Sequence, residues 1–239
     1  MRKFTKILLV ALMAVPFLYS CNTTYEQADK AALITVQKSL TPAGFYGILD
    51  NGERLYPGVM RVNYTPSNDL QRAIVYFSEL DEPREGFTYN ADVFNIAEIT
   101  TKYITQVRDV AADTLDNGLE ITNIWIGGGF LNVELKLDID PYMTSNVAIS
   151  LQDMVLDGPA NIEEGLYPLT LGVRCYPKSD SGNSTTVNTM VCFYIGSEYD
   201  LDNLGCSGYK ISYINLNSLP GDEKMFKIVT PENNAQSSF

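Results

Sequence analysis

Histidine is absent from the 239 residues of this sequence. The absence excludes serine-type catalytic triads, zinc-bound water held by histidines and iron sites with two histidine ligands. Positive charge is also scarce, because 17 lysine and arginine residues stand against 29 aspartate and glutamate residues and leave a formal net charge of −12. A partner held mainly through its phosphates would be repelled by this excess. We therefore expect no nucleic-acid ligand.

Long apolar runs are missing everywhere except near the N-terminus. Residues 1–20 begin with basic residues and continue into an apolar stretch at Ile7–Leu18, which is the pattern of an export signal. The stretch is too short for a transmembrane helix, which needs ~20 apolar residues. It ends in Leu18-Tyr19-Ser20-Cys21, which resembles a bacterial lipobox, although Tyr19 is bulkier than the usual residue. The alternative is an ordinary signal peptide that happens to end at a cysteine.

Lipidation at Cys21 follows from the lipobox interpretation. Two or three acyl chains on this residue are enough for stable attachment to a membrane. The polar segment 21–30 would then act as a tether, and no later segment approaches 18 consecutive apolar residues. We expect the body of the protein to be soluble and to be held at the cell envelope, in the outer membrane, by this lipid anchor.

After residue 30 the hydrophobic pattern has a period of two. Leu131, Val133, Leu135 and Leu137 alternate with polar residues, which is typical of a half-buried strand. Similar runs are rich in β-branched and aromatic residues and are separated by turn signals. These runs are Leu33–Lys38, Phe45–Leu49, Arg72–Glu79, Tyr89–Ile99, Tyr103–Val107, Ile121–Ile126, Ala148–Leu151, Leu166–Tyr176, Val187–Ile195, Lys210–Ile214 and Met225–Val229. No long segment has the helical period, so the predicted fold class is all-β.

A polar stretch at Asp109–Gly118 ends in a turn signal and suggests a domain boundary. The first piece, 31–112, holds five or six expected strands, a number that suits a small closed barrel of the OB type. The second piece, 118–230, holds about seven strands joined by short turns, which suits a β-sandwich. We therefore predict an OB-type barrel followed by a sandwich.

Four segments connect the chain to a known family. Phe45–Pro57, Gln71–Phe77, Val93–Lys102 and Ile124–Asn132 resemble, in their order and spacing, the NigD-like lipoproteins of Bacteroides relatives. Together with the lipobox, the resemblance covers nearly the whole chain and is weaker after residue 140. It implies an N-terminal OB-type domain followed by a C-terminal β-sandwich, and a role associated with bacteriocin production or immunity. It supplies no catalytic residue to transfer to this sequence.

A glycine run at Gly127–Gly129 invites comparison with a phosphate-binding loop. Such a loop needs a following Lys-Ser/Thr pair and a helix, and both are missing here. Glycines that permit a positive φ in a tight turn between two strands are the favoured interpretation.

Four aspartates, Asp138, Asp140, Asp153 and Asp157, were considered as ligands for calcium or as the acid/base pair of a glycosidase. The EF-hand spacing is absent, and a glycosidase needs two carboxylates at a set separation that a sequence does not reveal. With 29 acidic residues in the chain, solvated side chains are the simpler interpretation. We expect no metal and no cofactor.

Arg72 precedes the apolar run Ala73–Phe77 and is a possible contact for an acidic ligand. An arginine at the end of a strand more often pairs with a neighbouring carboxylate, and this remains the alternative.

Once Cys21 carries lipid, Cys175, Cys192 and Cys206 remain. If Leu166–Tyr176 and Val187–Ile195 formed a hairpin centred between Asn183 and Ser184, Cys175 and Cys192 would lie opposite each other, at a distance that allows a disulfide. Two buried thiols are the alternative, because a shift of one residue would turn Cys192 to the other face.

The sequence as a whole favours a binding protein over an enzyme. We expect attachment to the membrane through the lipid at Cys21 and recognition of a protein or peptide partner, related to a bacteriocin or to immunity against one. The alternative is an accessory subunit of a surface assembly for nutrient uptake or glycan binding.

Overall fold

The computed structural model describes residues 28–107, 119–139, 147–154, 162–175, 185–214 and 223–229. Within these ranges the chain forms thirteen strands and one four-residue helix, so the all-β prediction is confirmed. The chain divides into two compact units, and the boundary lies between Ile99 and Thr100. None of the helical segments in the described ranges has the length and hydropathy required to cross a membrane.

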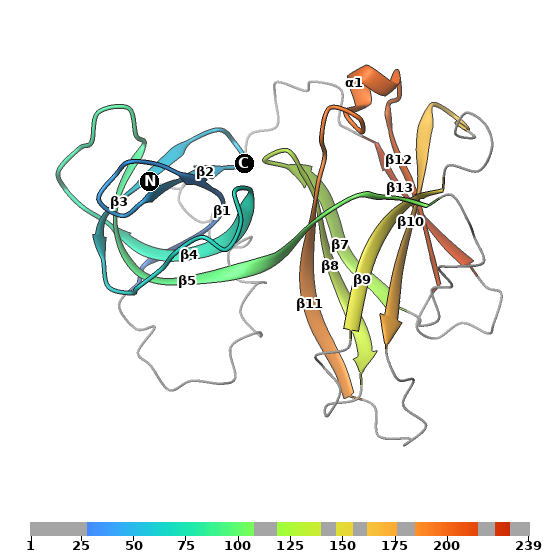
Figure 1. The fold of residues 1–239 in the computed structure, drawn as a ribbon, viewed down its shortest axis with the longest axis horizontal. Coiled ribbons are helices and arrows are strands. Elements are labelled where there is room, and N and C mark those ends of the chain that lie inside the picture. Colours follow the sequence, from blue (N-terminus) through green and yellow to red (C-terminus); the bar gives the residue numbers. More distant parts are fainter. Residues whose placement is uncertain are drawn as a thin grey trace, which may run out of the picture. The chain divides into compact units, whose positions relative to one another are not determined.

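The first unit is a five-stranded barrel of OB type (Figure 1). Its strands are β1 (Lys30–Lys38), β2 (Phe45–Leu49), β3 (Arg54–Met60), β4 (Gln71–Glu79) and the first part of β5 (Tyr89–Tyr103). They follow the order β3-β2-β1-β4-β5, and a parallel pairing between β3 and β5 closes the barrel. This order is that of an OB fold, as the sequence predicts.

The barrel interior is filled by the apolar members of the alternating runs. The fully or almost fully buried residues are Ile34, Val36, Phe45, Leu55, Ala73, Val75, Phe77, Ala91 and Val93. The sequence pattern does not predict strand β3, because the strand contains Pro57, which has no backbone N–H to donate to a neighbouring strand. The register shifts between Pro57 and Val59, so a bulge accommodates the proline where β3 pairs with β5.

The second unit is a β-sandwich. One sheet consists of the last residues of β5 (Thr100–Tyr103) with β11 (Thr185–Tyr194), β8 (Phe130–Ile139) and β7 (Leu119–Gly127). The other has the order β13 (Glu223–Val229), β12 (Gly208–Ile214), β10 (Leu166–Cys175), β9 (Val147–Met154) and β6 (Thr105–Val107). Helix α1 (Leu201–Leu204) lies between β11 and β12 in the chain (Figure 1).

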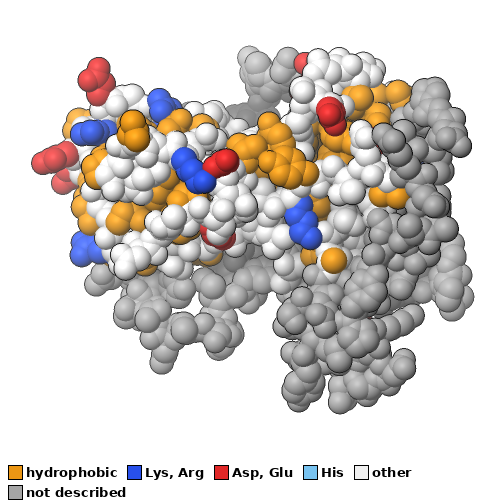
Figure 2. Space-filling view, in the orientation of Figure 1, with side chains coloured by type: hydrophobic (Ala, Val, Ile, Leu, Met, Phe, Trp, Pro, Cys, Tyr) orange, Lys and Arg blue, Asp and Glu red, His pale blue; other side chains and the backbone are white. Residues whose placement is uncertain are grey.

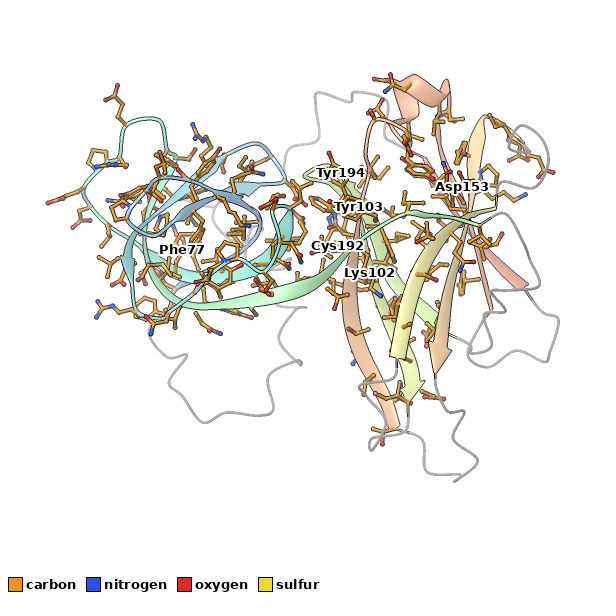
Figure 3. The ribbon with its side chains drawn as sticks, in the orientation of Figure 1. Phe77, Lys102, Tyr103, Asp153, Cys192 and Tyr194 are labelled. Atoms are coloured by element: carbon orange, nitrogen blue, oxygen red, sulfur yellow. The ribbon has the colours of Figure 1, made fainter. Side chains whose placement is uncertain are left out.

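The core of the sandwich comes from both sheets. Leu131, Val133, Leu135 and Leu137 of β8 are buried, as their alternation predicts, and belong to one hydrophobic cluster with Leu169 of β10. Lys102, on the β5 segment of one sheet, adds a polar link, because its Nζ donates a 2.7 Å hydrogen bond to the carbonyl of Ile149 on β9 (Figure 3). Burial lowers the pKa of Lys102.

The division between the units falls earlier in the chain than the expected break. Thr100–Tyr103 pair with β11 and Thr105–Val107 pair with β9, so both segments contribute to the sandwich. The expected first piece, 31–112, therefore contains residues of both units. The polar stretch Asp109–Gly118 itself lies outside the described residues.

The hairpin expected between Leu166–Tyr176 and Val187–Ile195 is wrong. Strand β10 pairs with β9 and β12, whereas β11 pairs with β5 and β8 in the other sheet. In this register Cys175 lies opposite Val147, and the buried Cys192 lies opposite Asn132 and Thr101. The register argument for a Cys175–Cys192 disulfide is therefore removed. The physical reason is that the alternating apolar residues of each run predict a strand but do not specify which neighbouring strand it pairs with.

Candidate functional site

Arg72 does not present its guanidinium to a ligand. Its side chain has no exposed surface, and Nη2 lies 2.6 Å from Oδ1 of Asp50 while Nη1 donates to the hydroxyl of Thr35 at 3.0 Å. The alternative interpretation, an ion pair with a neighbouring carboxylate, is the correct one. The strand register explains it, because Arg72 lies opposite Thr35 on β1.

Of the four aspartates, the structure describes Asp138 and Asp153, and their carboxylates have different partners. The carboxylate of Asp138 accepts a hydrogen bond from Thr186, and Asp153 is buried and accepts hydrogen bonds from Tyr167 and Tyr199 (Figure 3). Asp140 and Asp157 lie outside the described residues. The described part of the chain holds no group of three or more carboxylates or cysteines arranged to bind a metal ion.

Gly127–Gly129 form the expected tight turn between β7 and β8. Gly127 pairs with Phe130, and Gly128 and Gly129 have φ values of 60° and 81°. Left-handed conformation at two successive positions is the requirement of a type I′ hairpin turn, which glycine meets without strain. Cys21 lies outside the described residues, so its lipidation stays a prediction.

A cluster of aromatic and arginine side chains lies on one side of the barrel. Its members are Tyr46 on β2, Arg54 and Tyr56 on β3, and Arg84 and Phe87 in the loop between β4 and β5. We call this group the aromatic–arginine cluster. Strands 2 and 3 and the loop between strands 4 and 5 are the elements with which OB folds bind oligonucleotides and oligosaccharides. The cluster therefore occupies the usual ligand face of the fold.

Phe87 connects the cluster. Its ring centroid lies 5.8 Å from that of Tyr46 and 5.2 Å from that of Tyr56. The guanidinium carbon of Arg54 lies 4.6 Å from the Tyr46 centroid and 4.8 Å from the Phe87 centroid. Arg84 lies 4.6 Å from the Tyr56 centroid. The three distances between a guanidinium and a ring centroid are within the range of cation–π attraction.

A tight turn holds Phe87 in this position. The amide of Phe87 donates to the carbonyl of Arg84 at 3.1 Å, and Gly86 has a φ of 79°, as the third residue of a type II turn requires. The amide of Thr88 donates to the carbonyl of Arg54 at 2.8 Å and joins the loop to β3. Backbone hydrogen bonds therefore hold the main chain at Phe87 beside β3.

The two arginines of the cluster lack internal acidic partners. Neither Arg54 nor Arg84 forms an ion pair or a side-chain hydrogen bond with any residue in the described ranges. Both are exposed, and the visible face of the first unit in Figure 2 carries basic and acidic side chains scattered among hydrophobic ones. Guanidinium N–H groups that are stacked but unpaired are available to an acceptor from outside.

The first unit contains residues 33–99, which match the model of the NigD-like N-terminal OB domain. The match covers most of β1, all of β2, β3 and β4 and the whole barrel segment of β5, and it includes the whole aromatic–arginine cluster. The NigD-like resemblance seen in the sequence is confirmed for this unit.

Solved structures resemble the chain beyond the NigD-like barrel. A protein of unknown function, DUF1344, from Bacteroides vulgatus has a TM-score of 0.67 at 22% identity, over 86% of this chain and 92% of that one. A NigD-like immunity protein from Bacteroides caccae has a TM-score of 0.59 at 18% identity, over 90% and 100%. A protein of Bacteroides fragilis, provisionally described as a lipoprotein, has a TM-score of 0.60 at 11% identity, over 84% and 97%.

These similarities concern the fold alone, because every identity is below 25%. They show that other Bacteroides proteins share this fold. Among proteins of curated function, no sequence matches the chain.

The second unit contains a buried polar network. Oδ2 of Asp153 accepts hydrogen bonds from the hydroxyls of Tyr167 at 3.1 Å and Tyr199 at 3.2 Å, and the hydroxyl of Tyr209 donates to the carbonyl of Tyr199. Burial raises the pKa of Tyr199 to about 12 and raises that of Tyr167 further. Because both phenols stay protonated, they remain donors to the carboxylate, and the network ties β9, β10 and the segment after β11 together.

Proposed function

We propose that this protein is a lipid-anchored binding protein of the cell envelope and that its NigD-like barrel recognises a peptide or protein partner. The aromatic–arginine cluster carries the proposal. It lies on the ligand face of an OB barrel and combines aromatic rings with unpaired guanidinium groups. Aromatic residues and arginine are the side chains most enriched at the centres of protein interfaces.

The proposed location rests on two observations. The N-terminal segment has the pattern of an export signal that ends at Cys21, and acyl chains on this cysteine would hold the chain at the membrane. A similar structure from Bacteroides fragilis carries a provisional description as a lipoprotein.

The proposed partner is a bacteriocin or a related peptide, and the protein acts by binding it rather than by catalysis. A similar structure is named an immunity protein, which supports this choice of partner. The sequence has no histidine to serve as a general base, which favours binding over catalysis.

Cross-linking on intact cells tests the proposal. The tagged full-length protein is expressed in its native host, and partners are quantified for wild type, Phe87→Ala and Phe94→Ala. Phe94 is the matched control, because it is a half-buried phenylalanine of the same barrel outside the cluster. We expect Phe87→Ala to reduce recovery of the specific partner at least tenfold while Phe94→Ala retains it. Equal recovery with all three proteins would contradict the proposal, and recovery of transporter components would favour an accessory subunit.

A further inference from the structure

Each ring of the aromatic–arginine cluster has a guanidinium over one of its faces. Arg54 lies over Tyr46 and Phe87, and Arg84 lies over Tyr56, which is itself only 9% exposed. A nucleobase or a sugar ring would have to displace an arginine before it could stack on these faces. The groups that remain available are the N–H edges of the two guanidiniums, whose fork geometry matches a planar carboxylate.

The same barrel contains a complete version of this arrangement. The guanidinium of Arg61 lies 5.7 Å from the Phe94 centroid and holds Asp92 with two hydrogen bonds, Nε to Oδ1 at 2.9 Å and Nη2 to Oδ2 at 2.7 Å. These bonds hold the pKa of Asp92 below its usual range. Arg54 and Arg84 are stacked on rings in the same way and lack the carboxylate.

We propose that the aromatic–arginine cluster binds an acidic segment of an extended peptide, with Arg54 and Arg84 each holding one carboxylate. This inference rests on the binding function proposed above and names the chemistry of the partner. Two carboxylates on one face of an extended peptide stand ~6.6 Å apart, two residues along the strand. The two guanidiniums lie over neighbouring rings, because the centroid of Phe87, beneath Arg54, is 5.2 Å from that of Tyr56, beneath Arg84.

The surroundings favour a short acidic segment over a polyanion. Asp81, Glu82 and Glu85 lie exposed in the same loop as Arg84 and would repel a ligand that carries a charge at every unit. The chain as a whole has a net charge of −12. A peptide that places two isolated carboxylates on the two guanidiniums avoids this repulsion. A nucleic acid or a polyuronate, which carries a charge at every unit, does not.

An array of random octapeptides tests the inference with the detergent-solubilised full-length protein. The test variant is the double substitution Arg54→Gln and Arg84→Gln. The control is Lys38→Gln with Lys136→Gln, which removes the same amount of charge from partly exposed ion pairs elsewhere. Thermal melting of each protein confirms that it is folded. Polygalacturonate serves as a second probe, because it presents carboxylates without a peptide.

We expect peptides bound by wild type to be enriched several-fold in pairs of Asp or Glu two residues apart. The double arginine variant should bind the best of these peptides at least tenfold more weakly, and the control should bind them as wild type does. Absence of acidic enrichment, unchanged binding by the double variant, or preference for polygalacturonate would overturn the inference. The two proposals can fail separately. If Phe87→Ala abolished capture of a partner but the peptide array showed no preference for acidic peptides, the binding function would be supported and the recognition of carboxylates would be excluded.

Discussion

Arg72 and Asp50 form an ion pair in which one partner is fully buried and the other is partly exposed. The guanidinium of Arg72 has no exposed area, the carboxylate of Asp50 is 30% exposed, and the two atoms Nη2 and Oδ1 are 2.6 Å apart. Asp50 begins the turn between β2 and β3, so the pair connects that turn to β4. An arginine buried among apolar residues is tolerated only where such acceptors reach it.

Replacement of Asp50 by Asn should destabilise the protein. The substitution removes the charge that compensates the buried guanidinium while it keeps the size of the side chain. We expect the free energy of unfolding to fall by about 2–4 kcal/mol, somewhat less than for a fully buried pair because water reaches Asp50. Urea unfolding measures the change, and Asp69→Asn is the control, because its pair with Lys38 is exposed. An equally small loss for both variants would contradict the structural role of Arg72.

The tyrosine network around Asp153 should make the protein sensitive to alkali. The pKa of Tyr199 is raised to about 12, above its ordinary value of 10, because the phenol is buried. The unfolded chain therefore loses this proton first, and the free energy of unfolding, constant below pH 10 for this group, falls as the pH rises from 10 towards 12. Tyr199→Phe should cost about 1 kcal/mol at pH 7, through the lost hydrogen bond to Asp153, and should flatten the alkaline decline.

Urea unfolding at several pH values between 8 and 12 checks this expectation. Tyr103→Phe is the matched control, because Tyr103 is 69% exposed and its substitution should leave the pH dependence unchanged. An alkaline decline of the same steepness in Tyr199→Phe and wild type would show that other groups cause it.

Gly86→Ala should disturb the aromatic–arginine cluster through the backbone. A Cβ at Gly86 would meet no atom within 4 Å, so the cost comes from its φ of 79°, which L-residues rarely adopt. We expect a loss of about 1–2 kcal/mol in the free energy of unfolding and a several-fold weaker capture of the partner, because Phe87 follows directly. Gly196→Ala is the control, since its φ is not left-handed and the new methyl group would make an ordinary contact with Tyr194. Unchanged capture of the partner by Gly86→Ala would show that the turn at Gly86 does not position the binding site.

Cys21→Ser should abolish lipidation and leave a precursor that is not acylated. The thiol of Cys21 is the atom that the acyl transfer requires, and serine does not replace it. Growth with radioactive palmitate followed by immunoprecipitation measures the label. Equal incorporation into both proteins would exclude Cys21 as the lipidated residue.

The strands were predictable where one face of a run is apolar. Phe45–Leu49 forms a strand with the expected bounds, and the run Arg72–Glu79 lies within β4. β3 was missed because Pro57 and Gly58 interrupt its pattern, and the bulge that accommodates them depends on its neighbour β5. Tertiary pairing also determined the partners of β10 and β11, because their local patterns predict strands without specifying the neighbours of each strand.

The candidate site could not be found in the sequence by spacing. Tyr46, Arg54, Tyr56, Arg84 and Phe87 come from three separate segments, and none has an unusual local pattern. Only closure of the barrel brings the loop after β4 beside β2 and β3. Arg72 stands beside an apolar run, but its side chain alternates with the core residues that begin at Ala73, and it is buried against Asp50 and Thr35.

The order of the strands along the chain also determines which of the two units can fold first. Every pairing of the barrel lies between Lys30 and Ile99, whereas the sandwich joins Thr100 to Val191 and needs β13, which ends at Val229. An exported chain emerges on the far side of the membrane from its N-terminus, so all the barrel strands are present there before the last sandwich strand. The barrel can close its edges during this interval, and they are then unavailable to the strands that follow. A chain with many β-strands thus gains protection against mispairing from the sequence of events alone.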